Sequence, residues 1–130
     1  PNAWAVITYQ KGSWILHMLR RRLGDDAFQK LLATLYANNR YKAVSTEDFR
    51  RLAASLLPPK SPDPKLESFF DSWVYGTGVP QLKLTTSIKG KAPRVTFTAT
   101  LTQSEVNDDF SILVPIEIQT ARGKPVTHWI

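Results

Sequence analysis

The chain has 130 residues, a formal net charge of +6 and no cysteine, and 42% of its residues are hydrophobic and 22% charged. This composition is that of a folded globular protein and excludes disordered and fibrous classes. The absence of cysteine excludes disulfides, thiol nucleophiles and cysteine-ligated metal sites. No apolar run approaches the ~20 residues that cross a bilayer, so we expect no membrane segment in this chain.

The positive charge is spread along the sequence. Acidic residues are interspersed with basic ones in both halves, and Arg20-Arg21-Arg22 is the one run of bases. Three consecutive residues point in different directions from a helix, and cations are favoured at a helix C-terminus. We therefore interpret this run as a solvated helix end and expect no nucleic-acid partner. A basic nucleic-acid-binding domain, with salt-sensitive binding, is the weakest of the alternatives.

Two helices are predicted first. Apolar side chains between Ala5 and Leu23 surround most of a helix, which must therefore be covered by neighbours. Gly24 ends this helix, and Asp25 offers an N-cap to a second one, whose apolar residues over 28–35 recur at helical spacing. The pair is predicted to form an αα-hairpin.

Two more helices follow before Pro80. Ser45-Thr46-Glu47-Asp48 has the pattern of a capping box, which predicts a third helix that ends at Leu57-Pro58-Pro59. A fourth helix with an aromatic face is predicted from these residues: Leu66, Phe69, Phe70, Trp73 and Val74. Glycines at 76 and 78 and Pro80 end it.

After Pro80 the apolar period changes from helical to two. Strands are predicted at residues 82–88, 95–102, 110–118 and 126–130, with turns at 89–91 and 122–124. Alternation with threonine predicts that residues 95–102 have one buried and one solvated face. The fold class expected is therefore α+β, with a four-helix segment over 1–80 and a four-stranded antiparallel segment over 81–130.

Candidate metal ligands and nucleophiles are sparse. His17 and His128 lie far apart, and neither belongs to a zinc-binding pattern, so no zinc site can be assembled locally. His17 lies on an apolar helix, which favours a core or packing role. Ser13 and Ser45 lack a nucleophile elbow and paired His and Asp residues.

One motif carries more information. Tyr9-x-Lys11-Gly12 precedes an apolar helix through Met18-Leu19-Arg20 and then Leu23-Gly24-Asp25 with Phe28. This order resembles the zinc aminopeptidases related to membrane alanyl aminopeptidase and leukotriene hydrolase. The resemblance extends over residues 1–84 through further positions: Tyr36, Glu47-Asp48-Phe49, Phe69-Phe70, Trp73, Gly78-Val79-Pro80 and Leu82.

The resemblance implies a fold and an activity. Residues 1–80 would be the C-terminal part of a thermolysin-like catalytic domain, and residues 81–130 the start of a β-sandwich-like domain. In that family a His-Glu-x-x-His helix and a later Glu hold the zinc, and all of them would lie upstream of Pro1. We therefore expect a parent peptidase that hydrolyses N-terminal peptide bonds of peptide substrates, and an isolated chain that binds no zinc and is inactive. The alternative is a non-catalytic relative that serves as a protein-interaction scaffold.

The resemblance also implies a catalytic residue. By its place before Lys11-Gly12, Tyr9 matches the family tyrosine that stabilises the tetrahedral intermediate. A phenol stays protonated at neutral pH and can donate a short hydrogen bond to an oxyanion. Lys11 and Gly12 are interpreted as support, with Gly12 expected where another backbone approaches closely.

The predicted strands also indicate a partner, which is a second copy of the chain. A sheet of four short strands leaves open edges and an uncovered apolar face, which are sites of association between copies. We therefore expect self-association through the β-strand edges within residues 94–130.

Overall fold

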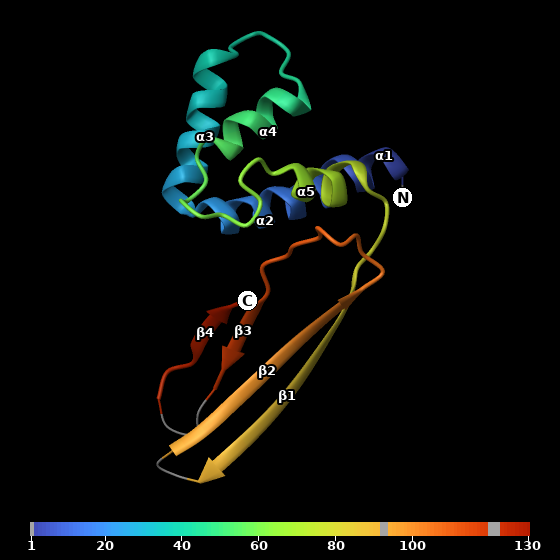
Figure 1. Ribbon diagram of the computed structural model, residues 1–130. Helices are drawn as coiled ribbons and strands as arrows, with labels where there is room; N and C mark the ends of the chain where they lie inside the picture. The colour runs from blue at the N-terminus through green and yellow to red at the C-terminus, as the bar shows by residue number, and fades with distance from the viewer. Residues whose placement is uncertain (1, 92–93, 120–122) are drawn as a thin grey trace.

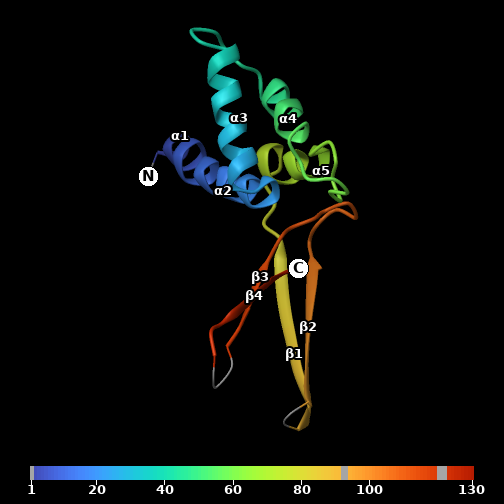
Figure 2. The ribbon, with the colours of Figure 1, turned by 90° about the vertical axis from the view of Figure 1, so that its left-hand side faces the viewer.

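The computed structural model describes residues 2–91, 94–119 and 123–130. Helices occupy the first part and two β-hairpins the second, which confirms the α+β class (Figure 1). The hairpins extend away from one side of the helical part, and the N-terminus lies on the helical part (Figures 1 and 2). No described helix combines the length and the apolar character that crossing a membrane requires.

The four predicted helical segments are found. The first is continuous from α1 (Ala3–Ala5) through the π-helical segment η1 (Val6–Lys11) to α2 (Gly12–Leu23). The others are α3 (Asp25–Asn38), α4 (Thr46–Ala54) and α5 (Glu67–Phe70), the last continuing as the π-helical segment η2 (Asp71–Tyr75). Figure 2 shows α3 beside α4, with α2 and α5 at their base.

Local chemistry explains the helix ends. Gly24, with φ 84°, is the N-cap of α3, so the expectation that Asp25 caps this helix is wrong. Asp25 instead lies in the first turn, where its carboxylate accepts a hydrogen bond from Arg20 at 2.7 Å. The cap of α4 is confirmed, because the Ser45 hydroxyl accepts the Asp48 N–H at 3.0 Å. This helix ends at Ala54, before the predicted Leu57, because the last turn tightens into hydrogen bonds three residues apart.

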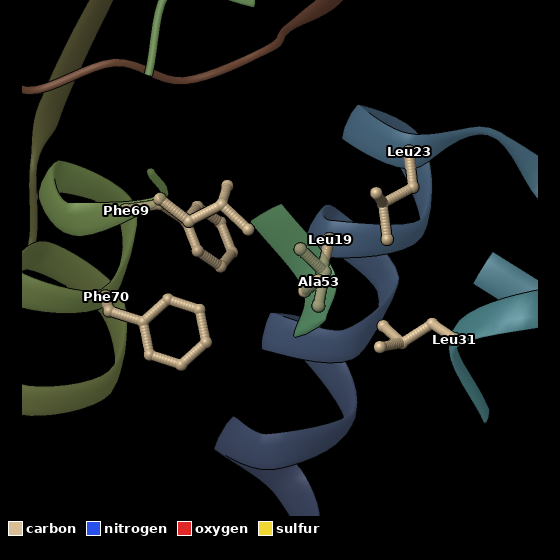
Figure 3. Close-up of a cluster of buried hydrophobic side chains, with 7 residues drawn as sticks. Leu19, Leu23, Leu31, Ala53, Phe69 and Phe70 are labelled. Atoms are coloured by element: carbon tan, nitrogen blue, oxygen red, sulfur yellow. The ribbon is translucent and has the colours of Figure 1, made fainter. Parts of the chain in front are cut away.

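The core lies among the helices. Its buried side chains come from α2, α3, α4, α5 and the residue before α5: Leu19, Leu23, Leu31, Ala53, Leu66, Phe69 and Phe70. Figure 3 shows the labelled members pointing into one shared space. Burial of each large apolar side chain is worth roughly 1.5–3 kcal/mol, so this cluster stabilises the helical part.

Gly12, at the start of α2, and Gly24, directly after it, allow the expected close backbone approach to be tested. Gly12 has the helical φ of −59°, and an added Cβ would meet only the Ile7 carbonyl oxygen of the same helix, at 3.9 Å. The close approach expected at Gly12 is therefore not found among the described residues. We expect Gly12→Ala to raise the free energy of unfolding by about 0.5–1 kcal/mol, measured by urea denaturation. Gly24→Ala is the control and should lower it, because φ 84° strains any L side chain.

The strands form two separate sheets where one was predicted. β1 (Gln81–Lys91) pairs with β2 (Arg94–Ser104), and β3 (Pro115–Ile118) pairs with β4 (Val126–Trp129), both antiparallel. The turn predicted at 89–91 is not found, because β1 continues as a strand to Lys91. Of the second predicted turn, Arg122 lies outside the described residues.

The third strand is shorter than predicted because its first residues contact the helices. Phe110 is buried, and its ring packs on Trp73 of η2 with ring centroids 5.6 Å apart. Ser68 of α5 also donates a hydrogen bond to the carbonyl of Asp109. Contacts with the helices thus take the place of strand pairing over residues 110–113.

The apolar face of the first hairpin is exposed. The register places Leu84 opposite Leu101 and Ile88 opposite Phe97 on one face, and the Ile88 residue is 70% exposed. The expected buried face is therefore not covered by the described residues. An uncovered apolar strand face of this kind supports self-association, which stays a prediction.

Candidate functional site

Tyr9 lies in the middle of η1. Its residue is 65% exposed, and its ring meets the ring of Trp4 edge to face, with centroids 5.6 Å apart. The wide π-helical turn is rare in proteins and is found often at functional sites. The phenol is thus presented on the surface, with its ring packed against Trp4.

Lys11 joins this turn to the end of the helical part. Its Nζ donates a hydrogen bond to the Gly76 carbonyl oxygen at 2.9 Å, and both residues are half-buried. The contact brings together two segments that lie 65 positions apart in the sequence. Because the donor is charged, this hydrogen bond is stronger than one between neutral groups.

A carboxylate network holds the segment before Gly76. The Tyr75 hydroxyl donates to Glu47 Oε1 at 2.9 Å, and Arg50 donates to Glu47 Oε2 through Nε at 3.0 Å and Nη2 at 2.8 Å. Hydrogen bonds from Arg50 and from Tyr75 lower the pKa of Glu47, and the bond to Glu47 raises the pKa of Tyr75. At neutral pH Glu47 is therefore ionised, while Tyr75 keeps the proton that it donates.

These contacts were not predicted. Glu47 was singled out only as part of a helix start, and Tyr75 lies 28 residues away in the sequence. The partner could be identified only once the fold had brought α4 beside η2.

The arginine run joins the helices to the second part of the chain. Arg22 is only 9% exposed, so the expectation of a solvated helix end is wrong for it. The reason is its spacing, which places it on the same helical face as Leu19 and Leu23. Its guanidinium covers the Phe69 ring at 5.0 Å and donates to both the carbonyl and the hydroxyl of Ser111. Burial lowers the pKa of Arg22.

A cavity of about 370 Å³ lies beside this junction. Three tryptophans contribute to its apolar wall: Trp14, Trp73 and Trp129. Tyr9 does not line it. We take the Tyr9 turn as the candidate site, because it carries the tyrosine that the resemblance implies to be catalytic and the nearby Lys11 contact, whereas the cavity wall is mainly apolar.

The two histidines do not converge. His17 is exposed and packs edge to face on Trp14 with centroids 6.1 Å apart, so it is a packing residue at the surface and not in the core. His128 lies in β4, opposite Ile116. Across the described ranges there is no group of three His, Cys, Asp or Glu residues that could hold a metal ion. The residues described here therefore do not fit a zinc site.

Comparison with known proteins shows that the region around Tyr9 is similar in sequence to aminopeptidases. The sequence model of the peptidase family M1 domain matches residues 1–73. The aminopeptidase N of Lactococcus lactis subsp. lactis is 37% identical over 76 residues, which is 58% of this chain and 8% of the relative. The aminopeptidase M1 of Arabidopsis thaliana is 33% identical over 75 residues, again 58% of this chain and 8% of the relative.

The match to a third relative covers slightly more of this chain. The leucine aminopeptidase 2-1 of Meyerozyma guilliermondii is 28% identical over 83 residues, which is 63% of this chain and 13% of the relative. The chain thus spans between 8% and 13% of the length of these relatives. No solved structure matches it significantly.

Proposed function

Because this chain belongs to peptidase family M1, we propose that it is part of a zinc-dependent aminopeptidase in which Tyr9 stabilises the transition state of peptide-bond hydrolysis. The observation that carries the proposal is the placement of Tyr9. It lies within the region that matches the family, in an exposed π-helical turn, two residues before Lys11, which is hydrogen-bonded to Gly76.

The chemistry assigned to this chain is the donation of one hydrogen bond. As water adds to the scissile carbonyl, negative charge develops on its oxygen, and a phenolic O–H aimed at that oxygen stabilises the charge. Tyr9 is suited to this role because its hydroxyl belongs to an exposed residue and can donate a hydrogen bond. A zinc ion in the whole enzyme would supply Lewis-acid chemistry, with ligands from outside the described residues.

The proposal includes a division of the chain. Residues 1–80 would form the end of the catalytic domain, with the cluster around Leu19 and Phe69 holding its helices together. Residues 81–130 would begin a β-sandwich-like domain that contacts the helices through Phe110 and Ser111. The exposed face of the first hairpin would then be covered by further strands.

Activity of the full-length protein tests the proposal. We expect it to hydrolyse an aminoacyl 4-nitroanilide and to leave the N-acetylated substrate intact, because an aminopeptidase requires a free amino end. A zinc chelator should abolish the activity, and added zinc should restore it. A folded full-length protein that hydrolyses neither substrate would contradict the proposal and favour a non-catalytic scaffold.

A further inference from the structure

Tyr9 and Lys11 lie on different faces of one helical turn. Residues two apart on a helix do not face the same way, and here Tyr9 is exposed while Lys11 is half-buried and bonded to Gly76. We propose that Lys11 is a positioning residue, which holds the η1 turn so that the Tyr9 hydroxyl points at the developing oxyanion. This inference rests on the proposed function of Tyr9.

The acceptor of the Lys11 hydrogen bond is itself held in place. Gly76 directly follows Tyr75, whose hydroxyl is bonded to Glu47 of α4 at 2.9 Å. A Cβ added to Gly76 would lie 2.5 Å from the Ser72 carbonyl oxygen, so the backbone runs closer to η2 here than any other residue type allows. The Gly76 carbonyl is therefore a fixed anchor, with contacts that run from α4 through η2 to Lys11.

The turn that carries Tyr9 needs such an anchor. A π-helical segment has a less favourable geometry than an α-helix and is maintained by its surroundings. Lys11 is the last residue of η1, and its hydrogen bond to Gly76 is a tertiary contact at that end. In the middle of η1, the ring of Tyr9 packs against Trp4 of the preceding helix α1. Loss of the Lys11 contact should let the turn relax and shift the phenol.

A double-mutant cycle in the full-length enzyme tests the proposal through activity. Lys11→Met should lower kcat by about 10²-fold, the effect of a misplacement of about 1 Å, with KM and zinc content unchanged. In a Tyr9→Phe background the same substitution should have little further effect, because the positioned hydroxyl is already absent. Lys11→Arg should restore much of the activity. Lys30→Met, at an exposed lysine of α3, is the matched control.

The cycle separates the two hypotheses. If the fold losses of kcat in the two single variants multiply in the double variant, Lys11 acts independently of Tyr9. That result would overturn the positioning role. Unchanged kcat in Lys11→Met would also overturn it. Near-normal turnover in Tyr9→Phe would instead overturn the proposed function itself.

Gly76→Ala provides a second test of the positioning role. It displaces the acceptor and leaves the Lys11 charge in place, so it should reproduce the loss of kcat seen in Lys11→Met.

A spectroscopic test needs no activity. In the 130-residue chain with ¹³C-labelled tyrosine rings, the Tyr9 signals can be assigned by their loss in Tyr9→Phe. The Trp4 ring, edge-on at 5.6 Å, makes these signals sensitive to the position of the phenol. Lys11→Met should shift or broaden them, whereas Lys30→Met should not. Tyr9 signals that stay in place in Lys11→Met would overturn the proposal.

Discussion

If the proposed function is right, replacing Tyr9 by Phe in the full-length protein is expected to lower kcat and kcat/KM together by about two to three orders of magnitude. The change keeps the ring that packs on Trp4 and removes only the hydroxyl donor. KM should hold, because the hydrogen bond is assigned to the transition state and not to the bound substrate. Steady-state kinetics with an aminoacyl 4-nitroanilide would measure all three quantities.

Two measurements support the interpretation of this result. Zinc content should be unchanged, since Tyr9 is not assigned as a ligand. Tyr36→Phe is the matched control, because Tyr36 is a similarly exposed tyrosine of α3 and should retain full activity. Near-normal turnover of Tyr9→Phe with intact zinc would mean that Tyr9 is a packing residue and that the role implied by the resemblance does not apply to it.

Leu31→Ala is expected to destabilise the chain by about 2–5 kcal/mol. Leu31 of α3 is 0% exposed and belongs to the cluster that joins the helices (Figure 3). Its truncation loses buried apolar contacts and leaves a cavity that the close-packed neighbours can fill only in part. Because a domain of this size has a small net stability, the variant should show a greatly lowered midpoint in urea denaturation followed by circular dichroism.

The adjacent residue provides the control for this prediction. Leu32 lies on the same helix but is 44% exposed, so Leu32→Ala removes the same atoms at almost the same sequence position. Helix propensity changes alike in both variants, and the difference between them therefore measures burial. Equal losses of stability would contradict the packing of α3 against the core.

Local patterns in the sequence were sufficient to locate the helical segments and the strands, although not all of their ends. The apolar period of 3.6 predicted the helices, and the period of two predicted the strands, because burial of one face sets these repeats. The Ser45 cap was predictable because its partner, Asp48, is three residues away. Recognition of the family likewise depended on short motifs around Tyr9 and Trp73, and the match over residues 1–73 confirms it.

Only the tertiary structure decided contacts between residues that are distant in the sequence. The Lys11–Gly76 and Tyr75–Glu47 hydrogen bonds join residues 65 and 28 positions apart, and no local pattern relates such partners. The alternation from Phe110 onward predicted a strand, but burial of Phe110 against Trp73 prevailed. Similarly, the charge of Arg22 predicted a solvated side chain, whereas Phe69 and Ser111 provide it with a buried site. In these last two cases a long-range contact outweighed a local preference.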